Sequence, residues 1–271
     1  MANQVAMVTG ASQGIGKGIA LVLGKAGYDI ALHCSSNKEA ALETAGEIRA
    51  MGGRCEVIQT DLSGYEGIVR LFDEFHRRFD RLDILVNNAG ITVGGSMLDM
   101  DIETFDKLNG IDWRGGFFCT QFAAKAMIAK GIKGSIILVT SNQSTMTFGG
   151  SAAYGSVKAA LRKFASHAAL ELSPYGIRVN ATAPGFTDTG NPRMGGKERT
   201  YNIIPLERWV TPEELGHMVL YLVSPEALSL TGVEIIIDGG AHMLCNDGGM
   251  VMLRERAKER ITALQGGQQV I

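Results

Sequence analysis

Residues 5–16 read VAMVTGASQGIG, and this stretch decides the fold. Its first half is a short apolar run typical of a buried β-strand. Its second half is a turn whose glycines are spaced Gly-x-x-x-Gly-x-Gly, and a segment of helical period follows over residues 15–26. A glycine-rich turn between a strand and a helix lets the backbone approach a pyrophosphate, which the N–H groups at the helix N-terminus attract. A simple tight turn would use the same glycines, but the position after the first strand favours a dinucleotide site formed by Gly10, Ser12, Gln13, Gly14, Ile15 and Gly16.

The rest of the chain repeats this alternation of short apolar runs with longer helical segments, which predicts the α/β class. Because the apolar runs are rich in Val, Ile and Leu, we expect a single Rossmann-type doubly wound domain, with a seven-stranded, mostly parallel sheet flanked by helices on both faces. The expected strands are Val5–Thr9, Asp29–His33, Glu56–Gln59, Ile84–Val86, Ser135–Thr140, Arg178–Ala183 and Glu234–Ile237. The expected helices cover residues 15–26, 38–51, 66–79, 101–129, 152–173 and 212–223.

Two regions interrupt this pattern. Residues 187–208 contain several glycines and prolines with Arg193, Lys197 and Arg199 between them, which predicts a substrate loop inserted into the domain. Residues 243–271 form a tail after the last strand, in which residues 250–264 have the apolar spacing of a short amphipathic helix. We therefore place the dinucleotide-binding domain at residues 1–242.

The composition limits the classes of partner. The 271 residues are 45% hydrophobic and 20% charged with a formal net charge of −2, so no basic field favours nucleic acid or an anionic membrane. The N-terminus runs directly into the first strand without the features of a secretory signal, and no apolar run approaches the roughly 20 residues of a membrane helix. The cysteines Cys34, Cys55, Cys119 and Cys245 lack disulfide or metal-ligand spacing. We expect a cytoplasmic protein without a metal ion.

A second pattern, YGSVK over residues 154–158, falls in the predicted helix 152–173. Positions i and i+4 lie on one face of a helix, so the Tyr154 phenol and the Lys158 ammonium can point into the same cleft. A phenol does not release its proton readily near neutral pH, but a cation about 5 Å away favours the phenolate by roughly 3 kcal/mol at an effective dielectric constant of about 20. The pair therefore predicts general acid–base catalysis by Tyr154, although the same spacing also occurs on ordinary helix surfaces.

Several further motifs stand after the other predicted strands. Asp61-Leu62 follows the third strand, Asn87-Asn88-Ala89-Gly90 the fourth and Pro184-Gly185 the sixth, while Ser141 stands thirteen residues before Tyr154 and Asp238-Gly239-Gly240 follows the last strand. In this order the motifs resemble those of the short-chain dehydrogenase/reductase family, and the resemblance spans roughly residues 4–241. It implies an NAD(P)-dependent oxidoreductase that transfers a hydride between a nicotinamide and a secondary alcohol or ketone.

The resemblance also implies roles for the matching residues. Tyr154 would be the acid in ketone reduction and the base in alcohol oxidation, Ser141 would bind the substrate oxygen, and Lys158 would assist the phenol and bind the nicotinamide ribose. Asp61 and Leu62 would lie at the adenine, Asn88, Ala89 and Gly90 at the adenine ribose, and Pro184, Gly185, Thr187 and Thr189 near the nicotinamide carboxamide.

One position departs from the family pattern. The family usually has an asparagine in a proton relay five residues before the residue that matches Phe117, and this chain has Asp112 there. If the relay uses the backbone carbonyl, Asp112 can substitute without loss. If the carboxylate is ionised near Lys158, it would stabilise the ammonium and change the pH profile. Asn109, one turn earlier, is a weaker stand-in, and we keep Asp112 as a candidate catalytic residue.

The cofactor preference depends on the end of the second strand, where an acidic residue would repel the 2′-phosphate of NADP. That position falls at Cys34, and the residues around it, including Ser35, are not acidic. We therefore slightly favour NADP over NAD, with Ser35 as a contact.

The substrate is less constrained by the sequence. Asn142, Gln143, Ser144, Thr92 and Ser96 suit a sugar, a polyol or another small carbonyl compound, whereas Phe148 and Phe186 suit an apolar ketone or a β-ketoacyl-type substrate. Two alternatives come from other classes: a catalytically weak dinucleotide-binding regulatory protein, and a sugar-nucleotide epimerase or dehydratase. The second resembles the extended branch of the same superfamily, whose chains usually carry a longer C-terminal substrate domain. The resemblance further implies a homo-oligomer, a tetramer or a dimer, assembled through helices 101–129 and 152–173.

Overall fold

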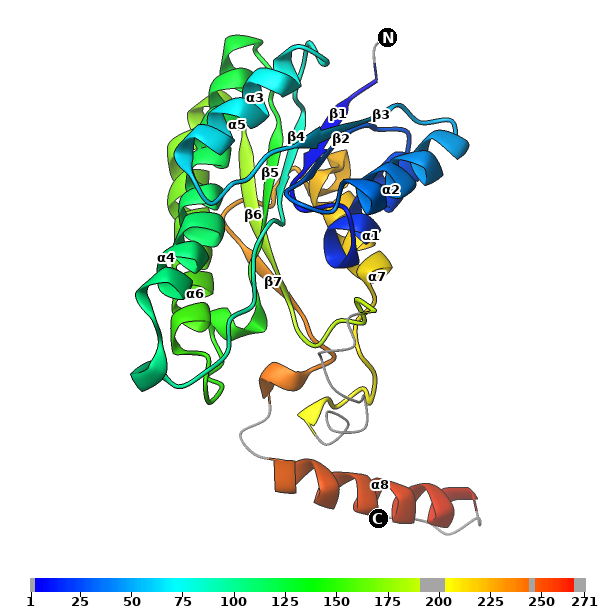
Figure 1. The fold of residues 1–271 in the computed structure, drawn as a ribbon. Helices are drawn as coiled ribbons and strands as arrows, with labels where there is room; N and C mark the ends of the chain where they lie inside the picture. The colour runs from blue at the N-terminus through cyan, green and yellow to red at the C-terminus, as the bar shows by residue number, and fades with distance from the viewer. Residues whose placement is uncertain (1–2, 191–202, 244–246, 266–271) are drawn as a thin grey trace.

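A computed structural model describes residues 3–190, 203–243 and 247–265. Its centre is one seven-stranded sheet in which all strands are parallel, in the order β3-β2-β1-β4-β5-β6-β7 (Figure 1). The strands are β1 (Val5–Val8), β2 (Asp29–Cys34), β3 (Cys55–Gln59), β4 (Ile84–Asn87), β5 (Ser135–Val139), β6 (Arg178–Pro184) and β7 (Glu234–Ile237). The chain leaves β1 toward β2 on one side and returns to β4 on the other. This order creates a crevice at the carboxyl ends of β1 and β4, where ligands of such sheets bind.

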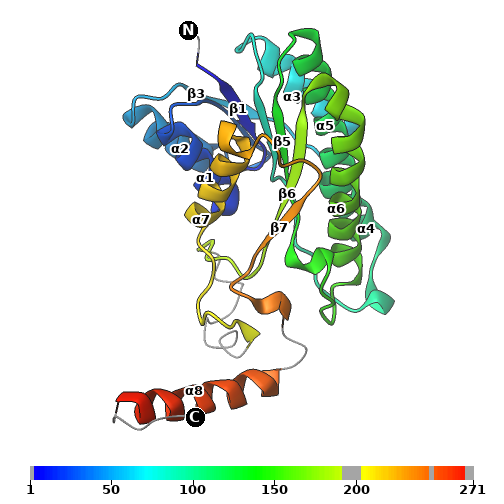
Figure 2. The same ribbon diagram turned by 180° about the vertical axis from the view of Figure 1, so that it is seen from behind.

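Helices cover both faces of the sheet, which confirms the predicted fold class (Figures 1 and 2). On one face lie α1 (Gly14–Lys25), α2 (Lys38–Ala50) and α7 (Pro212–Val223), and on the other lie α3 (Tyr65–His76), α5 (Gly115–Ala129) and α6 (Ala152–Leu172). The central strands β1, β4, β5 and β6 are buried on both sides, because alternate side chains enter two separate cores. Met7 of β1, for example, packs with α3 and α5, whereas its neighbour Val8 packs with α1 and α7.

The predicted helix over 101–129 is present, but a π-helical turn interrupts its regular α-helical pattern. The structure has a short α4 (Ile102–Leu108), a π-helical turn over Asn109–Arg114, and then α5. The π turn lies where the backbone passes very close to a neighbouring loop, since a Cβ added to Gly110 would be 2.6 Å from the carbonyl oxygen of Ser63. Inserted turns of this kind are frequent at functional sites. This one directs Asp112 into the interior, where its side chain is fully buried.

The described parts of the two irregular regions lie beyond the carboxyl edge of the sheet (Figure 1). Of the predicted substrate loop, residues 187–190 and 203–208 are described, while Arg193, Lys197 and Arg199 lie outside the described residues. The tail contains α8 (Asp247–Gln265), which covers the predicted helix 250–264 and is drawn apart from the sheet in Figure 1. Residues 255–262 of α8 are exposed. Among the described residues, no helix is both long and apolar enough to cross a bilayer.

Candidate active site

The glycine turn after β1 is packed so closely that side chains are excluded from it. A Cβ on Gly16 would lie 2.4 Å from the carbonyl oxygen of Gly10 and 2.5 Å from Nδ2 of Asn88. The N-cap residue of α1, Gln13, makes no side-chain hydrogen bond to the helix N–H groups, and the first turn of α1 has no acidic residue. The backbone donors at this helix end are thus left for an anion, which is the arrangement that a pyrophosphate requires.

Thr9 and Asn88 join the glycine turn to the turn after β4. The Asn88 amide donates to the carbonyl oxygens of Thr9 and Gly10 at 2.9 and 3.0 Å. The Thr9 hydroxyl accepts from the backbone N–H groups of Asn88 and Ala89 at 3.0 and 2.9 Å. These bonds fix the two turns to each other at the point where the sheet order reverses.

His33 is a part of this corner that the sequence analysis missed. It is the penultimate residue of β2 and is 1% exposed. Its Nδ1 accepts the backbone N–H of Gly10 at 3.1 Å, and its Nε2 donates to the carbonyl oxygen of Thr60 at 2.9 Å. Burial lowers the pKa of His33 to about 4, so the imidazole is neutral and Nδ1 stays an acceptor at neutral pH. A polar residue in an otherwise apolar strand next to the glycine turn was the available signal.

Tyr154 and Lys158 lie one turn apart on α6, with the Lys158 Nζ 5.5 Å from the centre of the Tyr154 ring. The ammonium is buried, forms an ion pair with Asp112 Oδ2 at 3.0 Å and donates to the carbonyl oxygen of Val139 at 3.2 Å. The other carboxylate oxygen of Asp112 accepts the backbone N–H of Ile91 at 2.9 Å. Burial alone would lower the pKa of Lys158, but the attraction of Asp112 and Tyr154 outweighs it, so the pKa is raised and the lysine is charged.

One cavity of about 500 Å³ brings the two predicted motifs together at the carboxyl edge of the sheet. From the glycine turn it is lined by Gly10, Gln13, Gly14, Ile15 and Gly16, from the turn after β4 by Asn88 and Gly90, and from α6 by Tyr154 and Lys158. No carboxylate is among the described residues that line it. Thr189, which also lines the cavity, packs over the glycine turn, since a Cβ on Gly14 would be 3.4 Å from its side chain. The residues present therefore fit an anionic dinucleotide.

The remaining predicted cofactor residues lie outside the cavity lining. Leu62 is buried in the core beside α3, and the Asp61 carboxylate accepts the N–H and the hydroxyl of Ser63, both at 2.9 Å, which lowers the pKa of Asp61. The Thr187 hydroxyl donates to the carbonyl oxygen of Gly185. Ser12, Ser35, Ala89 and Pro184 are likewise absent from the lining.

The turn that follows β5 carries Ser141. Thr140, directly before it, lines the cavity, while Ser141 itself is buried and its hydroxyl oxygen accepts the N–H of Gln143 at 3.2 Å. Two of the predicted substrate contacts nearby have other partners: the Asn142 amide donates to Asp238, and the Ser144 hydroxyl donates to Glu234. They are therefore bonded within the protein rather than free for a sugar hydroxyl.

Comparison with known proteins identifies the family. The sequence model of the family described as "Enoyl-(Acyl carrier protein) reductase" matches residues 10–242. The chain is a short-chain dehydrogenase/reductase. The family oxidoreductase function follows, which is the transfer of a hydride between NAD(P)(H) and the carbon of a secondary alcohol or ketone.

Three similar proteins illustrate the range of this family. The chain is 36% identical over 241 residues to a 3-oxoacyl-[acyl-carrier-protein] reductase of Synechocystis, covering 89% of this chain and 97% of the relative. The crystal structure of acetoin dehydrogenase from Enterobacter cloacae superposes with a TM-score of 0.84 at 37% identity, over 90% of this chain and 97% of that one. The angucycline C-6 ketoreductase LanV with bound NADP gives a TM-score of 0.83 at 31% identity, over 89% and 96%.

Proposed function

We propose that this short-chain dehydrogenase/reductase reduces a small ketone, and oxidises the matching alcohol, with Tyr154 as the general acid or base. The proposal depends on one observation: the glycine turn, with the N-terminus of α1 that no side chain caps, lines the same cavity as the Tyr154–Lys158 pair. The nicotinamide cofactor, when bound, supplies or accepts the hydride. The protein's own residues bind the substrate oxygen and move the proton.

Each side chain has a separate task in this proposal. The Tyr154 phenol donates its proton to the oxygen of the ketone as negative charge develops there. The buried Lys158 ammonium stabilises the phenolate that remains, and the Ser141 hydroxyl donates a hydrogen bond to the same substrate oxygen. Asp112 acts through Lys158, whose ammonium it holds in place at 3.0 Å.

For the cofactor we slightly favour NADP over NAD. Strand β2 ends at Cys34, and the exposed Ser35 after it offers a hydroxyl instead of a carboxylate that would repel a 2′-phosphate. LanV, which is similar over most of this chain, has NADP bound. Ser35, Asp61 and Leu62 would then surround the adenosine end, as the family pattern implies.

For the substrate we propose a sugar, a polyol or another small carbonyl compound, with a β-ketoacyl-type compound as the alternative. Because Asn142 and Ser144 bond to protein carboxylates, a small ketone with few hydroxyl groups is favoured over a sugar. Phe148 and Phe186 also form an edge-to-face contact, 6.2 Å between ring centres, beside the Ser141 turn. Both substrate classes occur among the similar proteins: acetoin dehydrogenase is named for a small hydroxyketone, and the 3-oxoacyl reductase for a β-ketoacyl group.

The test is a panel of diacetyl, acetoacetyl-coenzyme A and a ketose, each with NADPH and with NADH, followed by nicotinamide absorbance. Tyr154→Phe should lower kcat by about 10³-fold, in the middle of the usual range for general acid catalysis, while NADPH still binds as judged by its fluorescence. Cofactor binding without turnover of any panel member by the wild-type protein would support a regulatory protein instead. Unchanged turnover in Tyr154→Phe would refute the proposed role of the phenol.

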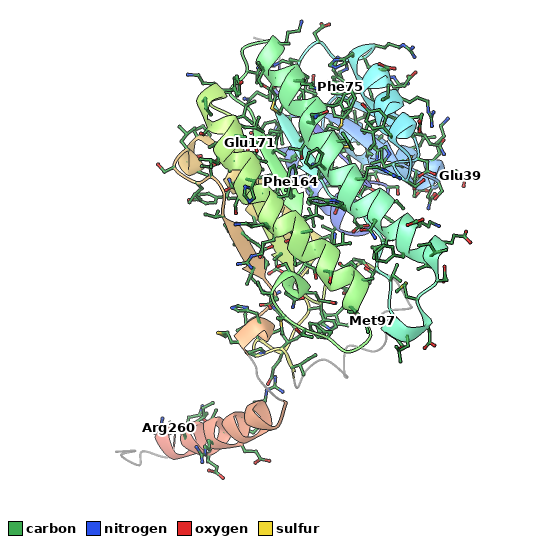
Figure 3. The ribbon with its side chains drawn as sticks, turned by 90° about the vertical axis from the view of Figure 1, so that its left-hand side faces the viewer. Glu39, Phe75, Met97, Phe164, Glu171 and Arg260 are labelled. Carbon is green, nitrogen blue, oxygen red and sulfur yellow. The ribbon has the colours of Figure 1, made fainter. Side chains whose placement is uncertain are left out.

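We further propose a homo-oligomer, a tetramer or a dimer, formed through the outer face of α5 and α6. Figure 3 views this side of the molecule, where Phe164 lies on α6. The face contains a hollow of about 680 Å³ lined by Trp113, Phe117, Ile128 and Phe164 among others. Ile128→Glu should therefore reduce the mass measured by light scattering, whereas Leu42→Glu, at a somewhat more exposed position on α2, should not. The reverse outcome would place the contact elsewhere.

We also propose that the enzyme works in the cytoplasm. Cys34, Cys55 and Cys119 are free, buried thiols, and a reducing compartment would keep them reduced. Fractionation of the producing cells would test this location.

A further inference from the structure

Strand β7 begins with a carboxylate that packing alone does not require. The Glu234 side chain is 7% exposed and faces the α6 side of the sheet, since the next residue, Ile235, packs into the opposite core with α1 and α7. A buried carboxylate is unfavourable unless it is fully hydrogen-bonded or paired, and an apolar residue would fill this strand position without that penalty. Glu234 therefore needs an explanation in its partners.

The partners of Glu234 stand on either side of Ser141. The Thr140 hydroxyl donates to Oε1 at 2.6 Å, and the Ser144 hydroxyl donates to Oε2 at 2.9 Å. The Arg162 guanidinium pairs with Oε2 at 3.0 Å. Arg162 lies one turn beyond Lys158 on α6, so Glu234 joins both ends of the Ser141 turn to the helix that carries Tyr154 and Lys158.

The other end of β7 holds the middle of the same turn. Asp238 is buried, and its Oδ2 accepts the Asn142 amide at 3.3 Å. Asp238 is itself held by the backbone N–H groups of Gly240 and His242, at 3.0 and 2.7 Å. Residues 140, 142 and 144 thus all bond to carboxylates at the two ends of β7, Glu234 as its first residue and Asp238 directly after its last. The Ser141 between them has only its bond from the Gln143 N–H among the described hydrogen bonds of its side chain.

We propose that Glu234 is a positioning residue that fixes the Ser141 hydroxyl relative to the Tyr154 phenol. The inference rests on the proposed roles of Ser141 and Tyr154. Its physical basis is the length of the Glu234 side chain, which lets one carboxylate contact two hydroxyls and a guanidinium from different segments of the chain. Catalytic groups must be held within about 0.5 Å of their productive geometry, so a small shift of this turn lowers kcat far more than it weakens cofactor binding.

The test separates the effect of the side-chain length of Glu234 from the effect of its charge. Glu234→Gln keeps the length of the side chain and can still bond Thr140 and Ser144, while Glu234→Asp keeps the charge but is one methylene shorter. With the panel member that is reduced fastest, Glu234→Gln should keep kcat within about threefold, whereas Glu234→Asp should lower it by about tenfold or more. NADPH affinity, measured by fluorescence, should stay within about twofold in both variants. If Glu234 matters only through its charge, the order of the two variants reverses and the inference is wrong.

A double-mutant cycle shows whether Glu234 acts through Ser141. Once Ser141→Ala has removed the hydroxyl, adding Glu234→Asp should lower kcat by less than about twofold further, because the group that it positions is gone. A full additional loss of activity in that background would overturn the inference. If Ser141→Ala itself leaves kcat unchanged, the proposed function fails instead, so the two failures are distinguishable.

Stability gives a second safeguard. Glu234→Asp could lower the melting temperature so far that unfolding explains its lower kcat. In that case Ser144→Ala is the variant to use, because it removes one hydrogen-bond donor to Glu234 and leaves Thr140 and Arg162 bound to the carboxylate. It should lower kcat with NADPH affinity unchanged, and a crystal structure should show the Ser141 hydroxyl displaced from its wild-type position. An unshifted Ser141 together with a wild-type kcat in Ser144→Ala would contradict the proposal.

Discussion

The cavity has two ends that are stabilised by different kinds of group. We call the end formed by the glycine turn at residues 10–16 the cofactor corner, and the end around Tyr154 and Lys158 the catalytic corner. The glycine turn is held by neutral groups, namely the Thr9 hydroxyl, the Asn88 amide and the uncharged His33 imidazole. Around Tyr154, in contrast, the supports are charge pairs: Lys158 with Asp112, both buried, and the half-exposed Arg162 with the buried Glu234. An anion site needs the backbone donors to face the ligand without competing negative charge, so no carboxylate is among the described residues that line it. A proton-transfer site needs charges that favour one protonation state, and these charges must be compensated.

The largest effect should come from uncoupling a buried charge pair in the catalytic corner. Lys158→Met leaves the Asp112 carboxylate buried without its cation and should lower the free energy of unfolding by about 3–5 kcal/mol, as measured in urea. The double variant Lys158→Met/Asp112→Asn removes both charges and should recover a large part of that loss. Equal stabilities of the single and double variants would show that Asp112 carries no charge in the folded Lys158→Met variant.

In the cofactor corner, steric overpacking rather than an unpaired charge should be the damaging change, and it should weaken NADPH binding. Gly16→Ala puts a methyl group 2.4 Å from the carbonyl oxygen of Gly10, and overpacking of this kind costs about 1–3 kcal/mol, so NADPH affinity should fall by about tenfold to hundredfold as the turn shifts. Gly46→Ala on α2 is the matched control, because nothing lies within 4 Å of its new Cβ. It should leave affinity unchanged and stability equal or slightly higher. Tight NADPH binding by Gly16→Ala would mean that the turn is more pliable than its packing indicates.

Lower pH tests the neutral support of the cofactor corner. Because burial holds the pKa of His33 at about 4 in the folded protein, below its ordinary value of 6.5, the unfolded chain binds more protons between these two values. Stability contributed by the neutral ring is present above pH 6.5 and is lost as the pH falls through this window, by about 2 kcal/mol at pH 5. Urea unfolding of the wild type and of His33→Asn at pH 7 and pH 5 measures this, and the variant should lack this share of the pH dependence. The same slope in both proteins would assign the effect to other groups.

The sequence was sufficient for the parts of the molecule that depend on periodicity and local motif. The strands, most helices and the face shared by Tyr154 and Lys158 follow from apolar spacing and from the i, i+4 geometry of a helix. The position of His33 in an apolar strand was a signal, but its role was not predictable, because it accepts an N–H from a residue 23 positions earlier and no local pattern records that contact. The π turn at Asp112 and the partners of Glu234 are likewise tertiary features: they arise where separate segments pack closely, which propensity cannot show.

The smallest effect concerns the departure at Asp112. Removing its negative charge leaves burial as the main influence on Lys158, so Asp112→Asn should lower the lysine pKa, and the ammonium should be lost at a lower pH than in the wild type. The alkaline decline of kcat/KM should therefore begin at lower pH in Asp112→Asn, with activity near pH 7 nearly retained. Asn109→Ala is the control: its amide donates to the Phe105 carbonyl one turn earlier, away from the ion pair, and its pH profile should match the wild type. If Asp112→Asn also keeps the wild-type profile, the carboxylate does not tune the ammonium, and the family relay through the backbone carbonyl becomes the better description of this position.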